Sequence, residues 1–353
     1  MAYTDIDDSS EYFQTALYTG SGSARNITND GNSDLQPDWV WIKKRSNGED
    51  HLLFDSVRGI NKSIKSNNTS AEQSDGGDLS EFRTDGFRIG TNNRSNQNTH
   101  TFVAWQWKAG TSFSNDASST SVGSIDSTGS VSTDAGFSII SWTSPNDSVA
   151  TIAHGLGSVP TMIIMKKRGA SGGWATYHQA LGNTHCLFLS TTAGKEDNDA
   201  VWNDTSPTST VFTTGSDGAL VNNTMIAYCF ADVQGFSKMG SYIGNGNADG
   251  VFVHTGFKVG WVMIKKTDGS ENWKIWDNKR PGFNDLNYQM NVNADEAESD
   301  SSNNRMDLVS NGFKMRGSGD TFNSSGGNYL FMAFAENPFT TSTGNNSIPS
   351  PAK

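Results

Sequence analysis

The chain has 353 residues, which is longer than most single domains and favours several units of ordinary size. Its 37 acidic and 26 basic residues give a net charge of -11, which argues against a general nucleic-acid binder, because such binding needs cations that neutralise phosphates. Only 34% of the residues are hydrophobic and 37 are glycines, so the composition predicts an all-β protein of short strands and many turns.

The N-terminal segment, residues 1–11, is acidic and lacks the cationic and apolar parts of a secretion signal. No stretch of the chain approaches the roughly 18 apolar residues that a membrane-spanning helix needs. We therefore expect no membrane insertion, and a protein that is made in a reducing cytosol and stays there until it is released. Cys186 and Cys229 are too few for a disulfide framework or a Cys-rich zinc site, and we expect two buried free thiols.

The sequence contains an internal repeat. The segment PDWVWIKKR around Lys43 recurs as PTMIIMKKR around Lys166 and as GWVMIKKT around Lys265. A second set of similar segments, HLLFDSVRG, WATYHQALG and WKIWDNKRPG, starts eight residues after each of these lysines. Identical offsets in three places are hard to obtain by chance, so we predict three copies of one unit of about 100 residues.

Strand-like segments also open and close each copy, as in YFQTALYTG, GFSIISWTS and GFSKMGSYIGNG at the beginnings. The Ser/Thr/Gly-rich segment after the first copy has a composition that cannot bury enough apolar surface to form a core, so we predict a linker. The predicted organisation is an N-terminal segment at 1–11, copies at 12–110, 136–234 and 235–339, a linker at 111–135 and a flexible C-terminal tail at 340–353.

The pattern within a copy is that of strands. In WVWIKK and MIIMKK the apolar side chains occupy both alternating faces, which is typical of a strand covered on two sides. Asp85-Gly86 and Asn311-Gly312 predict hairpin turns. We predict three tandem β-sandwich-like units; a single sheet assembly in which the units exchange strands is the alternative.

Catalytic motifs are not evident in this sequence. It has no nucleophile elbow, no phosphate-binding glycine loop and no His-Glu-x-x-His pattern, so we assign no catalytic, cofactor-binding or metal-binding residue. Asp55 and Asp277 occupy matching positions in the first and third copies, and His178 replaces them in the second. A sugar-degrading enzyme would need paired carboxylates in a cleft, and we expect these residues to cap or bridge their own units instead.

Two further polar features could form ligand sites. His154 and His254 occupy matching places in the second and third copies, and we interpret them as structural residues before a turn. The loop NGNADG, Asn245 to Gly250, resembles the opening of an EF-hand calcium loop. Gly256, however, stands where such a loop has its bidentate Glu. A plain turn is favoured, and calcium binding is left open.

The paired lysines at 43–44, 166–167 and 265–266 could form basic patches. Because neighbouring side chains on a strand point to opposite faces, we interpret each pair as a solvated strand end. The aromatic residues could form a sugar-binding platform, but Trp105 aligns with Tyr228 and with Met332, which keeps bulk without a constant polar group. Core packing is therefore expected for the strand aromatics, Trp39 and Trp41 included.

Recognition by such a scaffold would use the loops that differ between the copies. The candidate loops are 61–80, 187–210 and 284–304, which are rich in Asn, Asp and Ser. They could hydrogen-bond a polar ligand such as a glycan, or simply keep the protein soluble. No individual ligand-binding residue can be assigned.

The order of the segments YFQTALYTGSGS, QPDWVWIKKRS, LLFDSVRG, FRTDGFRIG, FVAWQWKAG, AHGLGSVPTMIIMKKR, CFADVQGFSKMGSYIGNG and YLFMAFAENPF resembles a family of marine bacteriophage proteins. These are described as tail-fibre-like or virion structural proteins with a lectin-like (concanavalin-like) β-sandwich character. The resemblance implies a virion component that is made in the host cytoplasm and displayed on the particle. It also implies other virion tail proteins as partners, a host-surface polysaccharide or outer-membrane receptor as ligand, and a homo-oligomer with a trimer favoured.

Two functions from different classes follow as expectations. The first is a non-enzymatic tail fibre or appendage component that takes part in host-surface attachment. The second is a capsid or tail decoration or connector protein with a purely structural role.

Overall fold

The computed structural model describes residues 4–145, 148–218, 220–280, 283–341 and 343. It confirms an all-β protein, because antiparallel sheets form nearly all of the regular structure and the helices α1 to α4 have only four residues each. The short helices are η1 (Ser9–Glu11), α1 (Asn93–Asn96), α2 (Ala117–Thr120), α3 (Asp199–Trp202) and α4 (Asp320–Asn323). Within the described residues, no helix has the length and apolar character needed to cross a membrane.

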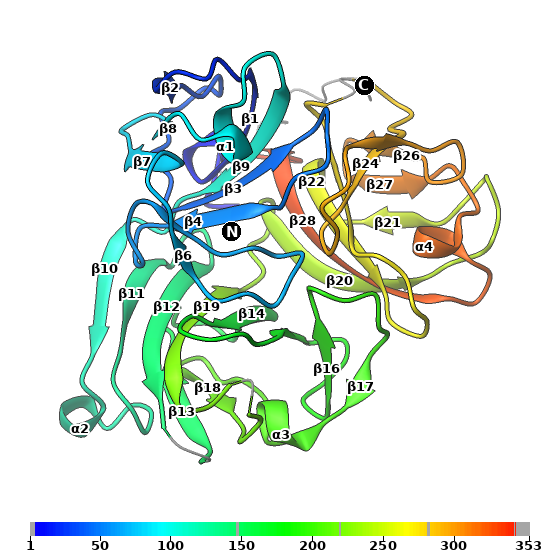
Figure 1. Cartoon of the computed structure of the whole chain (residues 1–353). Coiled ribbons are helices and arrows are strands. Elements are labelled where there is room, and N and C mark those ends of the chain that lie inside the picture. The colour runs from blue at the N-terminus through cyan, green and yellow to red at the C-terminus, as the bar shows by residue number, and fades with distance from the viewer. Residues whose placement is uncertain (1–3, 146–147, 219, 281–282, 342, 344–353) are drawn as a thin grey trace.

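Three larger antiparallel sheets are arranged around the middle of the molecule (Figure 1). In order across each sheet, the first contains β1 (Phe13–Thr19), β9 (Thr101–Trp107), β3 (Trp39–Lys44) and β4 (Leu52–Asp55). The second contains β10 (Thr111–Asn115), β11 (Ser127–Ser132), β12 (Phe137–Ser144), β19 (Asn223–Phe230), β14 (Met162–Lys167), β15 (Trp174–His178), β16 (His185–Phe188) and β17 (Glu196–Asp197). The third contains β20 (Ser237–Ile243), β28 (Asn328–Pro338), β22 (Phe257–Lys266), β23 (Lys274–Asp277), β24 (Tyr288–Asn291) and β25 (Ser299–Asp300).

Smaller sheets accompany the larger ones. They are β2 (Arg25–Ile27) with β8 (Phe87–Ile89) and β7 (Leu79–Phe82); β13 (Ala150–Ala153) with β18 (Val211–Thr214); β21 (Phe252–His254) with β27 (Gly312–Met315) and β26 (Met306–Val309); and β5 (Lys62–Ser63) with β6 (Gln73–Ser74). The predicted hairpin turns at Asp85 and Asn311 are confirmed, because β7 pairs with β8 and β26 pairs with β27. We call the sheets within residues 13–107, 111–230 and 237–338 the first, second and third sheet groups.

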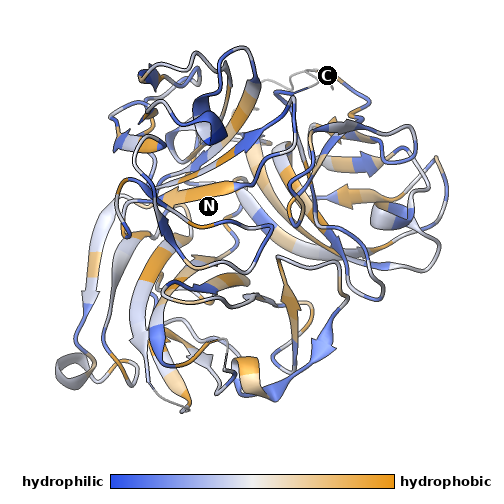
Figure 2. Cartoon of the chain, in the orientation of Figure 1, coloured by the Kyte–Doolittle hydropathy of each residue, from blue (hydrophilic) through white to orange (hydrophobic). Residues whose placement is uncertain are grey.

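Strand alternation divides the apolar residues between separate cores. On β3, Val40 and Ile42 join a core confined to the first sheet group, whereas Trp39 and Trp41 join a core shared by all three groups. The second sheet group has a core of its own as well. Figure 2 shows the corresponding pattern, with hydrophobic residues concentrated in the strands and hydrophilic residues in the peripheral loops. The expectation that Trp39 and Trp41 are core residues is confirmed, since each is 1% exposed.

Aromatic rings join the three sheet groups in the shared core. The pairs that cross between groups include Trp39–Tyr228 at 4.4 Å, Trp107–Trp261 at 5.5 Å and Phe230–Phe334 at 6.0 Å between ring centroids. Each such pair adds about 0.5–1.5 kcal/mol beyond the burial of its area. The three groups are therefore packed through one continuous apolar interior rather than joined by a flexible connection.

The segment 111–135 is not the spacer without secondary structure that its composition predicts. Strands β10 and β11 extend the second sheet beyond β12, and α2 lies between them (Figure 1). Backbone pairing with an existing sheet edge compensates for the scarcity of apolar side chains, which the composition argument did not consider. The predicted flexible tail at 340–353 lies mostly outside the described residues, whereas Ile6 near the N-terminus is buried in the shared core.

Candidate functional site: a polar cleft between the first and third sheet groups

The paired lysines are not solvated strand ends. The first lysine of each pair is 0% exposed and donates to a backbone carbonyl from a loop of a neighbouring sheet group. The Nζ-to-oxygen contacts are Lys43 to Asp295 at 3.3 Å, Lys166 to Thr69 at 3.1 Å and Lys265 to Thr192 at 2.9 Å. Burial lowers the pKa of each of these lysines from 10.5 to about 8.

The same loops exchange backbone hydrogen bonds with the neighbouring group. Between the first and second groups, the N–H of Gly172 donates to Thr69 and that of Glu72 to Arg168. Between the second and third groups, Glu271 donates to Thr192 and Lys195 to Thr267. Between the third and first groups, Glu49 donates to Asp295 and Glu298 to Arg45. Ion pairs reinforce two of the three contacts, between Arg168 and Glu72 at 2.9 Å and between Arg45 and Glu298 at 2.8 Å. We call these three sets of contacts, each with its lysine, the clamps.

The clamps use the segments that the sequence put forward as recognition loops. Parts of 61–80, 187–210 and 284–304 are bound to the second, third and first sheet groups respectively. Those parts are consequently not free to contact an external ligand. Recognition by the remaining parts of the three loops stays a prediction, and part of the variation between the loops serves contacts within the chain.

Buried polar pairs cross the same three interfaces closer to the shared core. They join Tyr228 Oη to Asp55 Oδ2 at 2.7 Å, Trp105 Nε1 to Asp277 Oδ2 at 2.9 Å and His178 Nε2 to the Phe331 carbonyl at 3.4 Å. Asp55 and Asp277 each also accept from a buried arginine, Arg58 and Arg280. Residues in matching sequence positions therefore bridge sheet groups, rather than only their own unit as predicted. In the third pair the roles are reversed. Met332 stands where the other two pairs have Trp105 and Tyr228 and offers no side-chain donor, so His178, at the position of the aspartates, donates to the neighbouring Phe331 carbonyl instead.

The other candidate residues have local partners. His154 is buried, with Nε2 3.1 Å from the Thr208 carbonyl, and burial lowers its pKa; His254 is exposed. In the NGNADG loop, the side-chain oxygen of Asn245 accepts from the Asn247 N–H. Asp249 pairs with Lys314 at 2.8 Å. These contacts already use oxygens that a calcium ion would need, and among the described residues no group of three or more His, Cys, Asp or Glu is placed to hold a metal.

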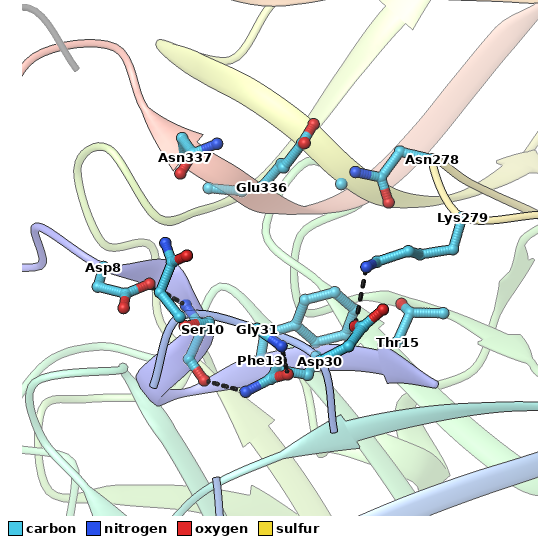
Figure 3. Close-up of a pocket in the computed structure, with 14 residues that line it drawn as sticks. Asp8, Ser10, Phe13, Thr15, Asp30, Gly31, Asn278, Lys279, Glu336 and Asn337 are labelled. Carbon is cyan, nitrogen blue, oxygen red and sulfur yellow. Dashed lines mark hydrogen bonds and ion pairs between the residues drawn. The ribbon is translucent and has the colours of Figure 1, made fainter. Parts of the chain in front are cut away.

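A polar cleft lies where the first sheet group meets the third, and it encloses about 230 Å³. Strand β1 supplies Phe13 and Thr15, and the loop after β2 supplies Asp30. Strand β28 supplies Glu336 and Asn337 from the opposite side, as Figure 3 shows. The cleft is therefore formed by residues far apart in the sequence.

One wall of the cleft is held rigidly by internal hydrogen bonds. Asp8 Oδ1 accepts from the Ser10 N–H at 2.9 Å, and Asp8 Oδ2 accepts from the Ser33 hydroxyl at 2.8 Å. Gln14 donates from Nε2 to the carbonyls of Ser10 and Ser33 and accepts from the Gly31 N–H. These groups shape the cleft without being available to a ligand.

Other groups in the cleft are available to a ligand. Lys279 Nζ pairs with Asp30 across the cleft at 2.9 Å, and both side chains retain substantial exposure, 38% and 70% (Figure 3). Thr15 also lines the cleft, but its Oγ1 is buried from solvent and is not among these groups. The side-chain amides of Asn278 and Asn337 line the cleft, and no hydrogen bond joins them to the described residues. An amide-rich hollow with one exposed Asp–Lys pair is suited to a small ligand that carries several hydroxyl groups.

The carboxylates of the cleft are each engaged by a neighbouring side chain. Asp8 accepts from serines, Asp30 pairs with Lys279, and Glu336 pairs with Lys258 at 2.8 Å. Sequence reasoning missed the cleft because no pattern links Asp30 to Lys279, which come together only through the packing of two sheet groups.

The fold and the cleft together define an all-β protein with several interlocked sheets and a polar cleft at one interface. The chain belongs to the family described as Domain of unknown function (DUF7483), whose model matches residues 8–338. No curated protein matches the chain significantly. No solved structure does so either.

Proposed function

We propose that the chain is a non-enzymatic bacteriophage virion protein, a tail appendage component that attaches to the host surface by binding polysaccharide in the cleft between the first and third sheet groups. The observation that carries the proposal is the chemistry of this cleft. Its free amides and the Asp30–Lys279 pair present donors and acceptors to a polyhydroxylated ligand on a rigid wall. The resemblance to marine phage proteins supports the location on a virion.

The proposal includes the architecture predicted from the sequence. We interpret each sheet group as a sandwich-like unit, in which a larger sheet faces a smaller one, and the three as copies of one lectin-like unit. The shared strand order β1-β9-β3-β4, β12-β19-β14-β15 and β20-β28-β22-β23 supports this interpretation. So does the common direction of the clamps, in which each group binds a loop of the group before it and the first binds a loop of the third.

Such an arrangement places three units around one core within a single chain. It supplies internally the layout that three separate chains would give in a homotrimer. The expected homotrimer and the contacts with other tail proteins remain predictions. Sedimentation equilibrium of the purified protein distinguishes the mass of one chain from that of three.

The test is binding of the fluorescently labelled protein to a panel of marine bacteria, with a variant that blocks the cleft. Asn32 lines the cleft and is exposed, so Asn32→Trp fills the opening without disturbing a buried contact. Asn98→Trp, at an exposed position of the first sheet group outside the cleft lining, is the matched control. We expect selective binding that Asn32→Trp abolishes, that Asn98→Trp retains, and that free host polysaccharide competes away.

The second candidate is a purely structural connector or decoration of the capsid or tail. The observation that favours it is the use of all three variable loops in clamps, which leaves less of their surface for a ligand. The same assay separates the two candidates. Absence of binding to every strain, the natural host included, supports the structural role, and binding that Asn32→Trp leaves intact excludes the cleft as the site.

A further inference from the structure

The second and third sheet groups differ in how one side is covered. Strands β12 and β20 occupy matching positions, since GFSIISWTS and GFSKMGSYIGNG align in the sequence and each pairs with the closing strand of its group. Strand β12 carries β11 and β10 on its outer edge (Figure 1), whereas β20 is the end strand of the third sheet. The third group therefore presents an edge that the chain itself covers in the second.

The cover on the second group is a short extended segment. Residues 127–132 pair with β12, and Ile125 forms a bridge with Ile152 on β13, so the segment closes the side between the larger and the smaller sheet. Ile125 and Val131 pack against the core of the second group. The remaining residues of GSIDSTGSVS, at 123–132, are small or polar. The cover thus combines backbone pairing with a branched apolar anchor.

The matching edge on the third group has unpaired backbone groups. The N–H of Met239 donates away from β28 to Asp232 Oδ1 at 2.9 Å, and its carbonyl accepts from Gln179. Because the backbone of an antiparallel strand alternates in direction, Ser241 and Ile243 also direct their N–H and C=O groups away from β28. Within the described residues, these outward groups have no partner.

Apolar side chains lie exposed beside this edge. Ile243 on β20 is 62% exposed, and Phe252 on β21 is 44% exposed. Strand β21 is itself the end strand of its smaller sheet, as expected if both sheets of the group are open on the same side. An exposed edge with apolar neighbours is a known template for pairing with another chain.

Hollows flank the edge on both faces. One of about 240 Å³ lies between β20 and β21 and is lined by Gly240, Phe252 and His254. The other, of about 500 Å³, lies on the opposite face of β20 and is lined by Ser241 and Ile243 together with residues of the second sheet group. A strand added to an edge directs its side chains alternately to both faces, so space on both faces is what an added strand requires.

We propose that the edge formed by β20 and β21 is a docking site for an extended segment of a partner protein, which adds to β20 as residues 123–132 of this chain add to β12. The partner segment is small and polar apart from two β-branched apolar residues that match Ile125 and Val131, of which the match to Ile125 is the anchor. The anchor enters the hollow between β20 and β21 beside Phe252, and the backbone of the segment pairs with Ser241 and Ile243. This interaction is independent of polysaccharide binding in the cleft.

The probe is a fluorescein-labelled peptide GSIDSTGSVS, with binding followed by fluorescence anisotropy on the intact protein. Ser241→Pro removes the outward N–H without breaking the pairing with β28, because proline is tolerated where the N–H faces away from the sheet. Ser241→Ala keeps the backbone donor and is the matched control. A peptide with Asp in place of the Ile anchor tests the apolar part of the contact.

We expect saturable binding that Ser241→Pro weakens by about tenfold or more, that Ser241→Ala leaves unchanged, and that the Asp-substituted peptide lacks. Absence of saturable binding, or binding that is indifferent to Ser241→Pro, would overturn the proposal. If the unlabelled protein dimerises and Ser241→Pro abolishes the dimer, the edge binds a second copy of the chain, and the proposal of a segment from a partner protein is overturned. Cell binding through the cleft is unaffected by any of these results, so the two proposals fail separately.

Discussion

Removing one hydroxyl group between the first and second sheet groups provides a sharp test of the interlocked arrangement. Tyr228→Phe deletes the hydrogen bond that Oη donates to Asp55 Oδ2 at 2.7 Å in a fully buried environment, together with a longer one that Oη accepts from Arg58 Nη2 at 3.4 Å. The ring remains stacked on Trp39, so no cavity larger than one oxygen atom is created. A hydrogen bond to a charged group contributes about 1.5–3 kcal/mol, and we expect the free energy of unfolding to fall by that amount.

The assay is equilibrium unfolding in urea, followed by tryptophan fluorescence. Tyr242→Phe is the matched comparison, because its hydroxyl donates to the neutral Phe322 carbonyl at 2.7 Å within the third sheet group. That variant should lose only about 0.5–1.5 kcal/mol. A loss below about 0.5 kcal/mol for Tyr228→Phe would refute the reasoning, since the contact would then carry no weight in joining the groups.

Other predictions concern the clamps and the thiols. Burial lowers the pKa of Lys166 from 10.5 to about 8, so between these pH values the unfolded chain holds a proton that the folded chain lacks, and this lysine makes stability rise with pH. In urea titrations across this range, Lys166→Met should make the slope less positive by up to about 1.4 kcal/mol per pH unit; an unchanged slope contradicts the burial of the charge. In the clamp around Lys265, Thr267→Arg combined with Lys195→Glu should install an ion pair like those of the other two clamps and raise stability by up to about 1 kcal/mol in the same assay, whereas a decrease would show that the clamps are not equivalent. Burial raises the pKa of Cys186 and Cys229 to about 12, so both should resist a thiol reagent in the folded protein and react in denaturant, as mass spectrometry can establish; rapid labelling of either in the folded state would contradict its burial.

The sequence predicted the strands and turns of the fold better than the contacts between its sheet groups. The all-β class, the hairpins at Asp85 and Asn311 and the burial of Trp39 and Trp41 follow from turn chemistry and strand periodicity, which are local properties. Lys43 was misread because alternation shows that a side chain points to a given face, but it does not show that another sheet group covers that face.

The candidate site was beyond the reach of sequence patterns for a related reason. Asp30 and Lys279 come together only because the first and third sheet groups pack against each other, and no sequence pattern links the two residues. The segment 111–135 shows the complementary error, since a composition typical of a linker can still pair with an edge that a neighbouring sheet provides. In both cases the deciding contact joins residues far apart in the sequence. The repeat in the sequence does not predict such a contact, because it does not show how the copies are arranged in space.

The central claim is that the clamps and the shared core make the three sheet groups one cooperative body, with the cleft as a fixed feature of one interface. Differential scanning calorimetry of the intact protein tests this most directly, through the ratio of the calorimetric to the van't Hoff enthalpy of unfolding. The account predicts a single transition with a ratio of about one. Three separable transitions, or a ratio near three, would contradict it, because the sheet groups would then unfold independently.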